Sequence, residues 1–116
     1  MDEKESAATS RIAKIIEMLE HVRRRPGMYT GGTSTARIGS FMSGFDMACG
    51  LFDLSIPWEI RDQARKQRGW QPTNEGWPIT EMRERGMTDE AIADEGLALD
   101  ILEWKLLMER MARQGE

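Results

Sequence analysis

The sequence predicts a mainly helical protein with a single domain, folded as a compact bundle of four or five helices. Apolar residues recur at intervals of three and four over several long stretches, which is typical of helices that bury one face. Clusters of proline and glycine separate these stretches and indicate turns. The chain has 116 residues, 40% of them hydrophobic, which is enough for one core without disulfide bonds. We expect a disordered polar tail over residues 1–8 and one helical domain over residues 9–116.

The first helix is expected to begin at Thr9 or Ser10, either of which can cap it, and to run to about Arg24. Its apolar residues share one face and comprise Ile12, Ile15, Ile16, Leu19 and Val22. Pro26 ends the helix, because the residue before a proline avoids α geometry. A glycine-rich loop follows over residues 26–33, with a short extended pair as a further expectation near Tyr29.

The second helix is expected from about Thr35 to Phe52, with Ser34 as its N-cap. We predict that its buried stripe comprises Ile38, Phe41, Met42, Phe45, Cys49 and Phe52. Three glycines also lie in it, namely Gly39, Gly44 and Gly50. Each costs about 1 kcal/mol relative to alanine in a helix interior, and close approach of another helix is the simplest reason for that cost. We therefore interpret this helix as the central one of the domain.

The third helix is expected to begin at Ser55 and Pro57, with the proline in its first turn, and to end near Gly69. A loop with two tryptophans follows, and then a short helical piece over residues 78–85 that Gly86 ends.

Thr88 is expected to cap the last helix, which runs to about Arg113. Two of its faces are apolar: one carries Leu97, Ile101, Trp104, Met108 and Met111, and the other Leu99, Leu102 and Leu106. A helix that is apolar on two sides is either sandwiched in the core or half of an oligomer interface. A homodimer through the last helix is therefore one of two alternatives.

The composition argues against several classes of function. There is one histidine, His21, and one cysteine, Cys49, so that neither a zinc site nor a nucleophile paired with histidine stands out. We expect no enzyme activity, no metal and no cofactor. The net charge of -4 disfavours general nucleic-acid binding. The polar start, the low cysteine content and the short apolar runs predict a cytoplasmic protein without a membrane segment.

The charges are unevenly spread along the chain. Residues 61–68 hold four bases against one acid, whereas residues 89–103 hold six acids and no base. Two interpretations stay open: the segments are solvated helix faces that attract each other, or one of them is a docking surface for a basic partner.

The glycine-rich loop is the first candidate site. It leads into a helix N-terminus, where free backbone amides and the helix dipole favour anions. The candidate residues are Arg25, Gly27, Tyr29, Gly31, Gly32, Ser34 and Arg37. Three interpretations stay open for the loop: a tight connector whose tyrosine packs on the core, a site for phosphate or a nucleotide, or a protein contact.

The tryptophans give a second set of candidates. Trp104 falls on a helix stripe and is expected in the core. Trp70 and Trp77 bracket a loop, where they either pin the loop to the core or anchor a partner, since tryptophan is favoured at binding hot spots.

Residues 18–31, which include Arg-Pro-Gly-Met-Tyr at positions 25–29, resemble the start of the gyrase B and topoisomerase IV ATPase domain. In that family the next helix carries a catalytic glutamate and an asparagine that holds magnesium. Here the corresponding residues 38–48 have neither in register, and Asp46 is their only carboxylate. The later glycine motifs of the family also lack a counterpart. No catalytic residue is carried over, and we expect no ATP hydrolysis.

The wider layout is similar to a group of short, poorly characterised bacterial proteins. The shared features are the loop at residues 25–29, Phe41 to Phe45, Trp58, Gly76-Trp77 and the acidic, apolar segment at residues 95–107. This resemblance implies a shared fold and no particular activity.

We therefore expect a small non-enzymatic protein-binding module, such as a toxin immunity protein or an inhibitor of a larger machine. Inhibitors of bacterial defence that phages or plasmids encode belong to this class. The alternative is a protein that binds phosphate or a nucleotide through residues 27–34.

Overall fold

A computed structural model describes residues 3–114, with side chains from residue 7 onward. Within this range the chain forms six helices and no strand: α1 (Glu3–Arg24), α2 (Pro26–Thr30), α3 (Thr35–Leu51), α4 (Trp58–Gln67), α5 (Ile79–Glu84) and α6 (Asp89–Gln114). None of them is long and apolar enough to cross a membrane. The mainly helical class is confirmed, and the number of helices slightly exceeds the expected four or five.

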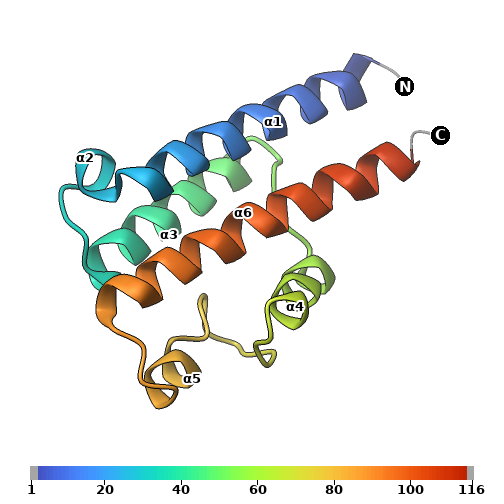
Figure 1. Cartoon of the computed structure of the whole chain (residues 1–116). Coiled ribbons are helices and arrows are strands. Elements are labelled where there is room, and N and C mark those ends of the chain that lie inside the picture. The colour runs from blue at the N-terminus through green and yellow to red at the C-terminus, as the bar shows by residue number, and fades with distance from the viewer. Residues whose placement is uncertain (1–2, 115–116) are drawn as a thin grey trace.

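Helix α6 is the centre of the arrangement, and the prediction that residues 35–52 form the central helix is wrong. α6 packs against α1, α3, α4 and α5. In Figure 1 it runs across the whole molecule, with α1 along one side and α4 and α5 on the other. Because neighbours surround it, α6 buries residues around most of its circumference, including Ile92, Leu97, Leu99, Trp104 and Leu106. It is thus sandwiched in the core, which is the first of the two arrangements expected for it.

Two helix starts differ from expectation. α1 begins at Glu3, before the expected caps, so that residues 3–8 form its first turns, while residues 1 and 2 lie outside the described part. The chain after Arg25 is helical rather than extended: the amide of Gly31 donates to the carbonyl of Gly27 at 3.0 Å. Pro26 ends α1 as predicted but also fits the first turn of a new helix, where its missing N–H is not needed. The expected extended pair near Tyr29 is therefore absent.

Local capping signals place the other boundaries. The Ser34 hydroxyl accepts from the amide of Arg37 at 3.1 Å, and that of Thr88 accepts from the amide of Ala91 at 3.2 Å. Gly86 adopts a φ of +80° just after α5, the left-handed conformation that glycine tolerates best. Pro57 is the N-cap of α4 rather than part of its first turn.

The loop between α4 and α5 is held down from two sides. The buried guanidinium of Arg65 donates to the carbonyls of Thr73 at 3.1 Å and Glu75 at 2.9 Å, and also to the carbonyl of Gly76. From the other side, the indole of Trp77 lies directly over Gly96 of α6, where an added Cβ would come within 2.2 Å of the ring. A close approach was expected at the glycines of residues 35–52, but the tightest contact is that of Trp77 with Gly96 of α6.

Candidate functional site

The residues predicted from the glycine-rich loop gather at one end of the bundle, around α2 and the start of α3. Arg25, Gly27, Tyr29, Gly31 and Ser34 are exposed there. The Arg37 side chain folds back over Gly31 and Gly32, with its Cγ 3.3 Å from where a Cβ of Gly32 would stand. The structure therefore brings these seven candidates together, and it separates them from Trp70 and Trp77.

The anion position at the start of α3 is already filled by a carboxylate of the chain. The Thr35 amide donates to Oδ2 of Asp89 at 2.9 Å, and the Thr35 hydroxyl donates to the Asp89 carbonyl at 2.8 Å. These hydrogen bonds lower the pKa of Asp89. A phosphate would have to compete with this internal anion for the same amide, which weakens the support for the alternative function.

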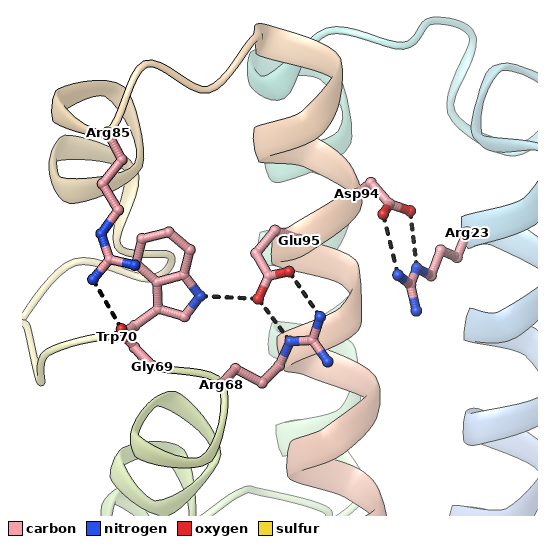
Figure 2. Close-up of polar contacts among 7 residues, drawn as sticks. All are labelled: Arg23, Arg68, Gly69, Trp70, Arg85, Asp94 and Glu95. Carbon is pink, nitrogen blue, oxygen red and sulfur yellow. Dashed lines mark hydrogen bonds and ion pairs between the residues drawn. The ribbon is translucent and has the colours of Figure 1, made fainter.

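The basic and acidic segments face each other, as the first interpretation of the charge pattern has it. Arg68 Nε and Nη2 donate to the two carboxylate oxygens of Glu95 at 2.6 and 2.8 Å (Figure 2). Arg61 Nε lies 3.8 Å from Oε1 of Glu103. On the other side of α6, Arg23 of α1 makes a similar fork with Asp94. Much of the acidic segment is therefore neutralised within the chain.

Trp70 and Trp77 are buried and pin their loop to α6, which is the first of the two arrangements expected for them. Trp70 Nε1 donates to Glu95 at 2.9 Å, and the Arg85 guanidinium covers the indole at 4.1 Å from its centroid (Figure 2). Trp77 Nε1 donates to Oδ2 of Asp100 at 3.1 Å. At this burial the two indoles offer a partner little surface. Trp104 is buried in the core, as predicted.

The exposed side of α3 and its C-terminal end form a surface that sequence reasoning missed. We call it the α3 surface; its residues are Ser40, Gly44, Met47, Ala48, Leu51 and Phe52. Met47, Leu51 and Phe52 are 73%, 80% and 69% exposed, although they are large and apolar. Trp58, at the start of α4, is also exposed. Contiguous apolar exposure of this kind is typical of interaction sites.

Phe52 was predicted in the buried stripe, and that prediction is wrong. α3 ends at Leu51, and Phe52 is its C-cap residue, with its amide bonded to the carbonyl of Cys49 at 3.0 Å. Asp53 then adopts a φ of +61°, which turns the chain away from the helix axis. The helical period therefore no longer places the Phe52 side chain on the core face.

One sequence signal for the α3 surface was available. Between residues 38 and 52, Asp46 is the only charged residue, whereas the outer face of a surface helix normally carries charges. The glycines were a second signal. A Cβ placed on Gly39 would lie 3.8 Å from the Trp77 ring, but nothing lies within 4 Å of a Cβ placed on Gly44. The close approach that Gly44 indicates is not supplied by the described part of this chain.

A cleft of about 710 Å³ runs beside the α3 surface. One wall is α3, with Gly39, Ser40, Ser43 and Asp46, and the opposite wall is Trp77 with Ile79. Asp100 of α6 and Arg61 of α4 also line it. The cleft thus joins segments that are far apart in the sequence.

Carboxyl groups outnumber cations at the inner end of the cleft. Burial and the neighbouring Glu103 and Asp46 carboxylates raise the pKa of Asp100 well above its usual value. Burial raises the pKa of Glu103 to about 7, although Arg61 opposes the shift. Burial also raises the pKa of Asp46. No group of three possible metal ligands in the described part of the chain is arranged to hold an ion.

Comparisons with protein-family models, with curated protein sequences and with solved structures find no match to this chain. The resemblance of residues 18–31 to the gyrase B domain therefore stands on those residues alone.

Proposed function

We propose that the chain is a non-enzymatic protein-binding module that contacts its partner through the α3 surface. The observation that carries this proposal is that α3 is apolar on two sides, of which only one packs against the rest of the bundle. α3 buries Ile38, Met42 and Cys49 against the bundle while it exposes Met47 and Leu51 to solvent. A helix that is hydrophobic all round is normally buried, so the second side of α3 is suited to another protein.

The energetics favour such a contact. Fully burying a leucine, methionine or phenylalanine side chain contributes about 1.5–3 kcal/mol each, and the α3 surface offers one of each. Gly44 and Ala48 have little or no side chain, so the surface of α3 is shallow at these positions and a partner's backbone can approach closely. Small modules that act by covering a surface of a larger protein include toxin immunity proteins and inhibitors of bacterial defence systems, and we place this chain in that class.

The proposal is tested by photo-crosslinking in the cells that express the chain. A photoreactive amino acid is placed at Leu51, and in a control variant at Glu109, an exposed position near the end of α6. We expect a specific crosslinked protein from position 51 and none from position 109. Met47→Asp should remove the crosslink while the circular-dichroism spectrum stays unchanged, because Met47 is exposed.

Equal crosslinking from both positions would contradict the proposal, since it would show contacts without a preferred face. A product of twice the chain's mass would identify a second copy as the partner, and would then make the α3 surface, instead of the last helix, the interface of a homodimer.

A further inference from the structure

The α3 surface and the cleft form one continuous feature. Ser40 belongs to the α3 surface and also lines the cleft, and Ser43, one turn before Met47, is exposed at the cleft rim. Any helix that lies along α3 therefore runs beside the cleft opening. A side chain that such a helix directs toward α6 would enter the cleft between Ser43 and Trp77.

The inner end of the cleft is suited to a cation. Three carboxyl groups, those of Asp46, Asp100 and Glu103, interact electrostatically with one another, and the first two line the cleft. Arg61 also lines the cleft and interacts with all three. Arg65 also interacts with Glu103, while its guanidinium donates hydrogen bonds to the carbonyls of residues 73, 75 and 76.

The other charged residues of the cleft leave this balance unchanged. Glu75 and Arg83 line it as well, and their charges are opposite. The Glu75 carboxylate accepts from the Thr80 hydroxyl at 2.8 Å, and Arg83 interacts with Asp89. Among the described residues neither Asp46 nor Asp100 makes an ion pair, so both are carboxyl groups in excess of bases where the cleft meets α6. A cation that enters there would favour their ionised forms.

We propose that the partner lays an α-helix along the α3 surface and inserts one of its lysine or arginine side chains into the cleft, between Asp46 and Asp100. This inference rests on the proposed function and names the chemistry of the partner. A long basic side chain matches the site, because its apolar stem can lie against Trp77 and Met42 while its charged end reaches the carboxylates. A partner with acidic side chains at that position would instead add like charge to a partly buried cluster.

The shape of the α3 surface selects a helix as the contacting element. Ser40, Gly44 and Ala48 are spaced by four residues and form a shallow track along α3, flanked by Met47 and Leu51. Small residues at this spacing let a second helix approach, and its larger side chains pack beside the track. An extended strand would find no free sheet edge to pair with, because the described part of the chain contains no strand.

Two helical peptides serve as probes. Both have about 18 residues, or five turns, with leucine and alanine on one face. The first carries lysine at all its polar positions, and the second carries glutamate there. Binding to the full chain is measured by isothermal titration calorimetry and by the change in tryptophan fluorescence, since Trp77 lines the cleft. We expect the lysine peptide to bind and the glutamate peptide to show no measurable heat.

Two variants of the chain test the cleft against general charge attraction. Asp46→Asn removes one negative charge inside the cleft, and Asp53→Asn removes one just after α3, outside it. Asparagine tolerates the positive φ of position 53, so the control keeps its backbone. We expect Asp46→Asn to weaken lysine-peptide binding by at least about tenfold, and Asp53→Asn to change it by less than about twofold.

A second pair of variants tests the helix track. Gly44→Gln places a long neutral side chain where a Cβ meets nothing in the chain, so the fold is kept while the track is blocked. Ala112→Gln adds a similar side chain to an exposed position near the end of α6. We expect Gly44→Gln to abolish binding and Ala112→Gln to leave it unchanged. Gly44→Gln should unfold at or above the temperature of the parent chain, and Ala112→Gln close to it.

The outcomes separate this inference from the function on which it rests. If Gly44→Gln abolishes peptide binding but Asp46→Asn and Asp53→Asn behave alike, the surface binds helices and the inserted base is wrong. Equal binding of the two peptides, or no binding of either, also overturns the inference. The position-51 crosslink decides the proposed function in each of these cases.

Discussion

Two helices of this molecule, α6 and α3, are apolar on more than one face and meet different fates. α6 lies among four other helices, so Leu97 on one side and Leu106 on another are both buried. α3 packs on the bundle with one side only and leaves Leu51 and Met47 in solvent. The comparison shows that the apolar pattern of a helix indicates how many of its faces favour burial. Whether other helices of the same chain bury those faces depends on the tertiary packing.

The largest expected effect separates two leucines. Leu97→Ala should lower the free energy of unfolding by about 2–5 kcal/mol, because Leu97 is 1% exposed and its removal leaves a cavity among packed helices. Leu51→Ala should change it by less than about 0.5 kcal/mol, since Leu51 is 80% exposed. Urea denaturation of the two variants measures both values. A large loss for Leu51→Ala would show that α3 is covered within the folded chain, and the comparison would fail.

The buried carboxyl groups of α6 predict a pH dependence. The folded-state pKa of Glu103 is raised to about 7, so between its ordinary value of 4.5 and 7 the folded chain holds a proton that the unfolded chain has lost. Stability should therefore be highest below this window, should fall as the pH rises through it, and should stay lower above it. The loss due to Glu103 is on the order of 3 kcal/mol.

Glu103→Gln should remove the part of this decline that is due to Glu103, while Asp100, whose pKa is also raised, should keep its own part. Urea denaturation at pH 5 and pH 8 measures the change. The matched control is Glu109→Gln, in an exposed position on the same helix, and it should keep the pH dependence of the parent chain. If Glu103→Gln leaves the decline unchanged, the carboxyl group of Glu103 does not titrate in the proposed window, and α6 is less completely covered at this point than the structure shows.

The smallest expected effects concern one glycine in each helix. Gly96→Ala should destabilise the chain by about 1–3 kcal/mol, because its Cβ would come within 2.2 Å of the Trp77 indole and the tryptophan would have to move. Gly44→Ala should stabilise it by up to about 1 kcal/mol, because alanine favours the helix and its Cβ meets nothing. Thermal unfolding shows both signs directly. Destabilisation by Gly44→Ala would mean that α3 already has a neighbour at this position.

Much of the fold could be predicted because its signals are local. Ser34 and Thr88 cap the helices that follow them, and the stripe from Ile12 to Val22 lies on one buried face apart from the half-buried Ile15. The predictions were wrong where one local sequence signal is compatible with two structures. Pro26 ends one helix, and it also starts another, which the sequence does not distinguish from a loop.

The site could be predicted only in part. The loop residues from Arg25 to Arg37 are neighbours in the chain, so their gathering was foreseeable. The cleft was not, because Asp46, Arg61, Trp77 and Asp100 come from four separate segments and meet only when α3, α4 and the loop after it pack on α6. The α3 surface was not predicted, because the buried stripe of α3 does not show whether another element covers the opposite, uncharged side of the helix.

The sequence by itself determined the helical class, most helix boundaries and the existence of oppositely charged segments, because these follow from periodicity, capping and composition within a few turns. The tertiary structure alone decided which helix is central, which acids are paired and which apolar face stays open. Those outcomes depend on helix packing, because the same apolar faces could be paired in several arrangements. Once one helix covers a face of α6, no other helix can occupy that face. For this reason Leu97 and Leu51, each of which follows a glycine in a helix, differ in the folded chain from almost complete burial to exposure.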